Sequence, residues 1–219
     1  MNIYLIRHAE PNYETDNLTP TGLIQAQRLA DYLADVQFTH LYCSPLGRAR
    51  ATLTPALATQ RAEPITLDWL RELEAQLPDG RWCWNVTLAD LFERPGLARQ
   101  IESFMADQQT RLLARWDSLL AGHGYQREGL LYHLPRASRQ KPIAAMFCHA
   151  GLITTLLAGL FQLPLAATYA RLKYPPTGIT HLQISHHDGF ADLRLVSYAA
   201  RPHLDLRAQL DLQDSAYLG

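Results

Sequence analysis

Short continuous apolar runs alternate along the chain with longer segments in which apolar residues recur every three or four positions. The runs at 2–6, 39–43, 65–67 and 143–147 are predicted to be buried strands. The segment 97–120 keeps its apolar side chains close to one face, which predicts a long helix that Gly122 ends. Strands that alternate with helices predict an α/β domain with a mainly parallel sheet flanked by helices.

Two further helices are predicted to begin with a hydroxyl residue followed by proline. Thr19-Pro20 supplies an N-cap and a first helical residue, and an apolar stripe follows it. Ser44-Pro45 repeats the pair and predicts a helix to about Ala58, with a kink at Pro55.

The last third of the chain predicts a buried helix at 152–161 and then a hairpin. The strands at 179–185 and 190–198 are joined by a turn that contains Asp188-Gly189, so they should add antiparallel strands to the sheet. The segment from about 76 to 141 is predicted to be a helical insertion over the sheet edge, within a single domain that spans 1–219.

Composition excludes several classes of protein. The 219 residues carry 47% hydrophobic side chains, a formal charge of −1 and a pI near 6.7. That charge gives no basic footprint, so we expect no nucleic-acid partner. No apolar stretch is long enough to cross a bilayer, and the N-terminal run is too short for a signal peptide. The three cysteines, Cys43, Cys83 and Cys148, are odd in number and widely spaced and contain no CxxC pair, which argues against a disulfide framework and against a four-ligand zinc site. We expect a cytoplasmic protein without a membrane partner.

Chemistry-bearing side chains follow three of the predicted strands. Arg7, His8 and Glu10 come after the first strand, Arg48 opens the helix after the second, and His149 comes just before the helix that follows the strand at 143–147. Because ligands of open α/β sheets bind at the carboxyl ends of the strands, these side chains are predicted to lie together.

The same side chains match the needs of phosphoryl transfer. Guanidinium groups bind a phosphate dianion by bidentate contact, and N–H groups at a helix start add to this. An imidazole with a pKa near 6.5 is an unprotonated nucleophile at neutral pH, and a carboxyl with a raised pKa protonates the leaving alkoxide. No metal or other cofactor is expected, because arginines take the place of a divalent ion.

Two other hydrolase classes were weighed. A cysteine phosphatase needs a cysteine, five residues and then arginine; counting from Cys43 reaches Ala49, and counting from Cys148 reaches Thr154, so the register fails. A metal-dependent hydrolase that uses His8, Glu10 and His149 stays open, although it lacks a compact metal motif.

Taken in order, the motifs resemble those of the histidine phosphatase superfamily, in its phosphoglycerate mutase-like branch. The matching segments are Arg7-His8-Ala9-Glu10, 18–27, 44–52, Leu70-Arg71-Glu72 and Cys148-His149-Ala150-Gly151. The resemblance implies a three-layer sandwich with the insertion over the active-site edge.

The resemblance also implies a role for each site residue. His8 is the nucleophile that forms a phosphohistidine, and Glu72 is the proton donor. The phosphate pocket consists of Arg7, Arg48, His149 and Ala150, with His149, if protonated, adding to the positive field. Water then hydrolyses the phosphoenzyme.

The chain departs from the family pattern at three places, of which one is Pro11, which removes a backbone donor just beyond the first motif. Ala9 replaces the usual glycine, and the usual continuation of the acid motif is missing after Glu72, which leaves Glu74 and Glu10 as alternative donors. We expect a phosphatase for small organic phosphate monoesters. The alternatives are a phosphoglycerate-type mutase, although the longer mutase signature is replaced after Glu10, and a catalytically weak protein that binds phosphate esters.

Two features outside these motifs bear on partners. Trp82 and Trp84 either form an apolar roof over the pocket or pack the insertion onto the sheet. An exposed edge strand or the 190s hairpin offers a way to pair two copies, so a homodimer is an open expectation.

Overall fold

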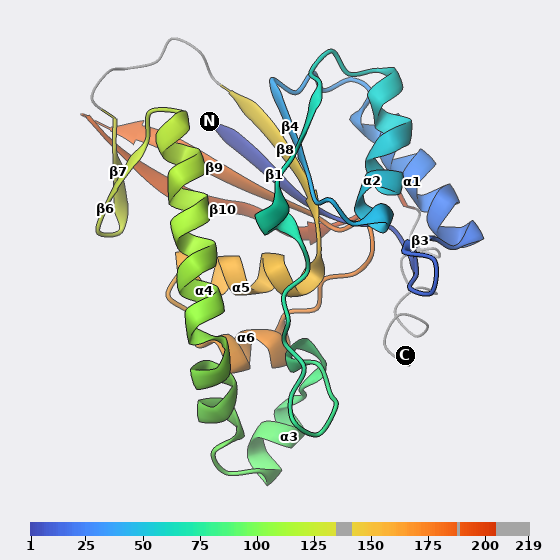
Figure 1. Cartoon of the computed structure of the whole chain (residues 1–219). Coiled ribbons are helices and arrows are strands. Elements are labelled where there is room, and N and C mark those ends of the chain that lie inside the picture. Colours follow the sequence, from blue (N-terminus) through green and yellow to red (C-terminus); the bar gives the residue numbers. More distant parts are fainter. Residues whose placement is uncertain (135–141, 188, 205–219) are drawn as a thin grey trace.

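The computed structural model describes residues 1–134, 142–187 and 189–204, which form a mixed eight-stranded sheet with helices on both faces (Figure 1). The strand order is β5-β4-β8-β1-β9-β10-β7-β6. One half of the sheet is parallel and consists of β1 (Asn2–Arg7), β4 (His40–Cys43), β5 (Pro64–Thr66) and β8 (Ile143–Cys148). All four strands were predicted to within two residues at either end.

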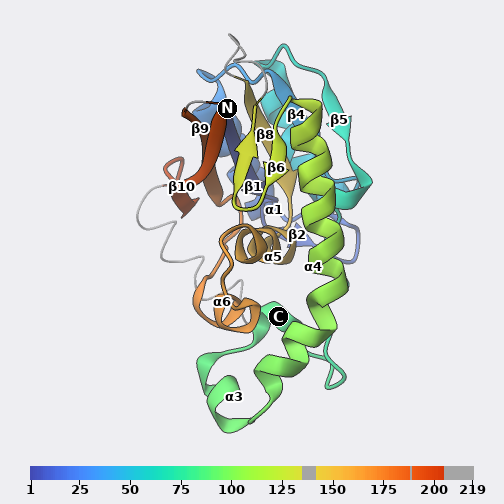
Figure 2. The same cartoon turned by 90° about the vertical axis from the view of Figure 1, so that its left-hand side faces the viewer.

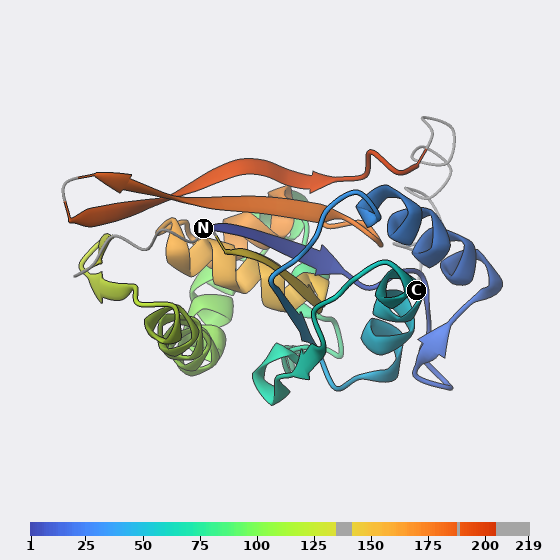
Figure 3. The same ribbon diagram turned by 90° about the horizontal axis from the view of Figure 1, so that it is seen from above.

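The other half of the sheet is antiparallel. The predicted hairpin consists of β9 (Ile179–His187) and β10 (Phe190–Ala200), and it pairs with β1 through β9 (Figure 3). The predicted turn residue Asp188 lies outside the described residues. Two short strands that were not predicted, β6 (Gln126–Glu128) and β7 (Leu131–His133), continue the sheet beyond β10. The sheet is therefore mixed rather than mainly parallel.

The helices cover the parallel strands in two layers. Side chains of β8 alternate between the faces: Ala145 and Phe147 pack with α1 (Pro20–Leu33) and α2 (Gly47–Leu53), whereas Met146 packs with α4 (Leu97–Gly122) and α5 (Ala150–Leu160). Burial on both faces explains why the strand sequence is continuously apolar. The predicted three-layer arrangement is confirmed.

A smaller cluster lies below the sheet. The N-terminal half of α4 projects there with α3 (Leu88–Glu93), η3 (Cys83–Asn85) and α6 (Leu165–Arg171) (Figure 2). Its buried core includes Leu77, Val86, Ile101 and Met105. Residues 135–141 of the proposed insertion lie outside the described residues. The assignment of 76–141 as an insertion in one domain stays a prediction.

The two predicted helix starts have different outcomes. Thr19 caps α1, and its hydroxyl accepts a hydrogen bond from the Gly22 N–H at 3.0 Å, as predicted. Ser44 does not cap α2: the N-cap is Leu46, and the helix begins at Gly47. The Gly47 N–H donates instead to Asp16 Oδ2 at 2.6 Å, so a carboxylate from another loop satisfies this helix start.

The ends of α2 and α4 follow from the proline and the glycine in their sequences. The α-helix α2 ends at Leu53, and a 3-10 segment, η1 (Thr54–Ala58), continues it, because Pro55 has no N–H to donate. Gly122 is the last residue of α4, close to the predicted end. Within the described ranges, no helix is both long enough and apolar enough to cross a membrane.

Candidate active site

The adjacent strands β4, β8 and β1 end at one edge of the sheet and bring the predicted site residues together. The His8 backbone N–H donates to the Cys148 carbonyl at 3.0 Å, which ties the end of β1 to the end of β8. The rings of His8 and His149 have centroids 5.1 Å apart and planes inclined by 56°. Both side chains are buried, with 2% and 0% of their residue surface exposed.

His8 is held as a neutral imidazole with a defined tautomer. Its Nδ1 lies 2.7 Å from the Ala9 carbonyl oxygen, and because that oxygen only accepts, Nδ1 carries the proton. Burial, followed by the positive charge of Arg7, holds the pKa of His8 well below its usual value. The Nε2 atom therefore keeps a free lone pair.

Ala9 fits this geometry despite replacing the usual glycine. Among the described residues, positive φ angles outside glycine occur at Asp16, Gln162, Thr177 and Ala199, so position 9 does not require glycine. The Ala9 N–H donates to Thr52 Oγ1 at 2.9 Å, which fixes the signature to α2.

Arg7 and Arg48 approach both imidazoles from different elements. Their charges are among the causes that lower the pKa of His8 and of His149. Arg7 Nη1 donates to the Tyr174 carbonyl, and Arg48 Nη1 donates to Asp16 Oδ1. The Nε atom of each arginine is buried and has no hydrogen-bond partner within the described residues. Each guanidinium is thus anchored by one nitrogen and keeps another for a ligand.

The loop between β2 (Pro11–Asn12) and β3 (Asn17–Leu18) holds Arg48 in place. Asp16 binds both the Arg48 guanidinium and the start of α2, and the Tyr13 ring lies 5.4 Å from Arg48 Cζ. A Cβ at Gly47 would lie 2.1 Å from the Asp16 carbonyl oxygen, so only glycine allows this approach. Sequence reasoning missed Asp16 and Tyr13, because no motif links this loop to Arg48.

His149 is the N-cap residue of α5, and Ala150 is the first residue of that helix. Its Nε2 lies 2.8 Å from Ser44 Oγ, while its Nδ1 is buried without a partner in the described part of the chain. Burial, together with Arg48 and Arg7, lowers the pKa of His149 to about 2. In this setting the neutral ring is favoured, so the positive charge that His149 would add if protonated is disfavoured.

Glu72 binds the same helix start. Its Oε2 accepts from the Gly151 N–H at 3.2 Å, and its Oε1 accepts from the N–H groups of Leu152 at 2.9 Å and Leu73 at 3.1 Å. Burial raises the pKa of Glu72 even though these hydrogen bonds act in the opposite direction. A carboxyl with a raised pKa beside His149 is suited to proton donation.

The two alternative donors lie in other settings. Glu10 Oε1 accepts from the Thr19 hydroxyl at 2.7 Å, and the Glu10 N–H donates to Gln25, so this residue belongs to the start of α1. Glu74 is exposed, and its carbonyl accepts from Gln108. Of the three glutamates, Glu72 is the one seen to bind the start of α5.

Trp84 packs against Gly151 next to Glu72. A Cβ at Gly151 would lie 2.4 Å from the Trp84 ring and 2.9 Å from Glu72 Oε1, so the indole, the helix start and the carboxyl are in close contact. Trp82 stacks on Trp84 with centroids 5.0 Å apart and 8° between the planes, and it is 40% exposed. Trp84 thus packs against the start of α5 and borders Glu72, and the roof over the pocket stays a prediction.

The alternative chemistries find little support. Burial raises the pKa of Cys43 to about 12 and raises that of Cys148 as well, so neither thiol is prone to ionise. Within 1–134, 142–187 and 189–204, no three His, Cys, Asp or Glu side chains are grouped so that they could hold a metal ion.

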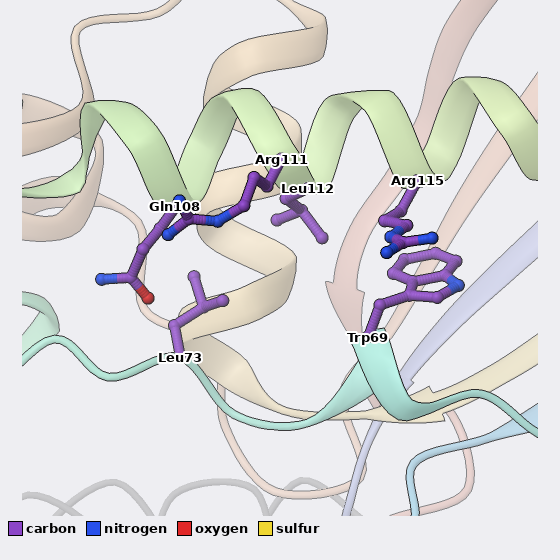
Figure 4. Close-up of a pocket in the computed structure, with 6 residues that line it drawn as sticks. All are labelled: Trp69, Leu73, Gln108, Arg111, Leu112 and Arg115. Atoms are coloured by element: carbon purple, nitrogen blue, oxygen red, sulfur yellow. The ribbon is translucent and has the colours of Figure 1, made fainter.

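A separate cavity of about 220 Å³ lies between α4 and the stretch of chain around Glu72 (Figure 4). Its lining consists of Trp69, Leu73, Gln108, Arg111, Leu112 and Arg115. None of the predicted site residues lines it. Its size therefore does not bear on the phosphate pocket.

Comparison with known proteins identifies the family of this chain. The family model of the histidine phosphatase superfamily (branch 1) matches residues 3–195. The chain belongs to this superfamily. The sequence-based expectations of the family and of a phosphatase are thereby confirmed.

The individual relatives share between 20% and 30% sequence identity with this chain. A probable phosphatase of Schizosaccharomyces pombe is 25% identical over 85% of this chain and 88% of its own. A probable phosphoglycerate mutase of Proteus mirabilis is 30% identical over 61% of this chain and 69% of its own. The crystal structure of a phosphoserine phosphatase from Entamoeba histolytica with 3-phosphoglyceric acid superposes with a TM-score of 0.65, covers 92% of this chain and 98% of its own, and is 20% identical. At that identity the likeness shows the shared fold alone.

Proposed function

We propose that this protein hydrolyses small organic phosphate monoesters through a phosphohistidine at His8. The observation that carries the proposal is the set of buried nitrogens without partners in the described residues, Arg7 Nε, Arg48 Nε and His149 Nδ1, around a neutral imidazole. Buried polar groups are rarely left unpaired, so these nitrogens point to an anionic ligand.

In the first step, His8 Nε2 attacks the phosphorus atom while the ester P–O bond breaks. Arg7 and Arg48 offset the negative charge of the transferring group, and Ala150 at the start of α5 contributes a helix-terminal N–H. Glu72 gives its proton to the leaving oxygen, so the organic part departs as a neutral alcohol.

In the second step, water attacks the phosphohistidine. The Glu72 carboxylate formed in the first step takes a proton from this water, the N–P bond breaks, and inorganic phosphate and neutral His8 result. Each group returns to its starting protonation state, so the cycle closes with water as its second substrate. We place the reaction in the cytoplasm, because the widely spaced cysteines suit a reducing compartment.

The stacked tryptophans bear on the leaving group. Trp84 borders Glu72, and Trp82 extends the apolar surface outward, so the oxygen that Glu72 protonates has an apolar neighbour on its organic side. We therefore expect monoesters with an apolar or aromatic part to be preferred over phosphoproteins.

Release of inorganic phosphate from a panel of monoesters tests the function and separates it from the mutase alternative. We expect phosphate release in excess chelator, with higher kcat/KM for aryl and apolar alkyl esters than for small polar ones. Incubation with 3-phosphoglycerate should yield phosphate and glycerate. Conversion to the 2-phosphate isomer without phosphate release would instead establish a mutase, and binding without turnover would establish a phosphate-ester-binding protein.

Replacing Asp16 with alanine is expected to raise KM about three- to tenfold and to change kcat less. The Arg48–Asp16 ion pair is partly exposed, with side-chain exposures of 12% and 43%, so its loss should weaken substrate binding by about 1 kcal/mol. Steady-state kinetics on an aryl phosphate measure this effect. Glu14→Ala, an exposed change in the same loop, is the matched control. An unchanged KM for Asp16→Ala would show that Arg48 does not depend on this loop.

A further inference from the structure

Ser44 provides a contact to His149 that the sequence did not indicate. It follows β4 and is fully buried, and its Oγ lies 2.8 Å from His149 Nε2. The same oxygen accepts a hydrogen bond from the Leu46 N–H at 3.2 Å. The hydroxyl that was predicted to cap α2 therefore lies between the turn after β4 and the second imidazole.

The donors and acceptors at this contact define the direction of the hydrogen bond. The Ser44 oxygen already accepts a hydrogen bond from the Leu46 N–H. Within the described residues, the acceptor for the hydrogen of the Ser44 hydroxyl is His149 Nε2. If Nε2 carried the ring proton, the serine hydrogen would lack this acceptor. Donation from Ser44 to Nε2 avoids that loss. The ring proton then lies on the buried Nδ1, whose N–H has no partner within the described residues and is left for a ligand.

Building on the proposed function, we propose that Ser44 is a positioning residue that holds neutral His149 in the Nδ1–H tautomer, so that Nδ1 donates to the transferring phosphoryl group. In the other tautomer, Nδ1 would present a lone pair to phosphate oxygens and repel them. A neutral donor also avoids a third buried cation beside Arg7 and Arg48. Ser44 thus acts on the reaction through His149 and does not touch the substrate.

The tautomer is measurable without any activity. The ¹⁵N chemical shifts of the His149 ring, recorded on protein labelled with ¹⁵N-histidine and assigned with His149→Ala, distinguish Nδ1–H from Nε2–H. We expect Nδ1–H in the wild-type protein and a shift towards a tautomer mixture in Ser44→Ala. A wild-type ring protonated at Nε2 would overturn the proposal, even if the enzyme proves to be an active phosphatase. Conversely, a failed assay for phosphate release would leave this test intact.

A double-mutant cycle separates the tautomer from a structural role at the start of α2. We expect Ser44→Ala to lower kcat about tenfold, less than the roughly 100-fold loss typical of removing an oxyanion donor outright. In the His149→Ala background the same change should alter kcat less than twofold, because the group it acts through is gone. An equal loss in both backgrounds would mean that Ser44 acts through Leu46, and the proposal would fail.

Discussion

Replacing His8 with alanine is expected to lower phosphate release at least about 10,000-fold, the scale seen when a covalent nucleophile is removed. The side chain is buried, neutral and fixed by its own backbone neighbour, so no other group replaces its Nε2. The methyl group of alanine leaves the pairing of β1 with β8 and β9 intact, because that pairing uses backbone atoms alone. The variant should therefore fold and still bind phosphate through Arg7 and Arg48.

A rapid acid-free quench with a ³²P-labelled monoester measures the intermediate directly. Wild-type protein should carry a ³²P label that is lost in acid and retained in alkali, because a phosphorus–nitrogen bond is labile in acid and stable in alkali. The His8→Ala variant should carry no label. His133→Ala, on β7 at the far side of the sheet, is the matched histidine control and should behave as wild type. Labelling of His8→Ala at the wild-type level would show that another residue is the nucleophile.

The elements that hold the site were predictable because each depends on local sequence. Continuous apolar runs identified the parallel strands, and the rule that ligands bind at strand ends grouped Arg7, Arg48 and His149 before their distances were known. The strands β6 and β7 were not predictable in this way. Each is three residues long; β6 pairs with β7, and β7 alone pairs with the distant hairpin, so their apolar pattern is too short to carry a signal.

The residues that orient the site were hidden for a different reason. Asp16 and Ser44 act through contacts with residues 32 and 105 positions away, and a polar residue in a loop gives no sign of such a partner. Ser44 was in addition misread, because Ser-Pro before a helix is a strong local cap signal that a tertiary hydrogen bond overrode. The protonation state of His149 likewise depends on burial and on two arginines, neither of which is a property of its neighbours in sequence.

The assignment of the proton donor is the other large expected effect. Glu72→Gln should lower kcat by about 100- to 10,000-fold on an alkyl phosphate, whose leaving alkoxide needs a proton. The loss should shrink to about tenfold or less on p-nitrophenyl phosphate, whose leaving group departs as a stable anion. Glutamine keeps one acceptor oxygen, which can still accept from the Leu152 and Leu73 N–H groups, and it loses only the acceptor that Gly151 uses, so most of the contact with the start of α5 should be preserved. Glu74→Gln and Glu10→Gln, the two other candidate donors, are the controls.

The pH profile gives this assignment a second test. Glu72 donates only while protonated, so in the wild type the first step should slow as pH rises through its raised pKa. His8 attacks only while unprotonated, and because its pKa lies well below the usual value, the acid limb should lie below about pH 6.5. Glu72→Gln should abolish the alkaline limb for alkyl phosphates and leave the acid limb in place, because glutamine does not titrate. If Glu74→Gln or Glu10→Gln removes that limb instead, the proton comes from that residue, and the carboxyl at the start of α5 has only a structural role.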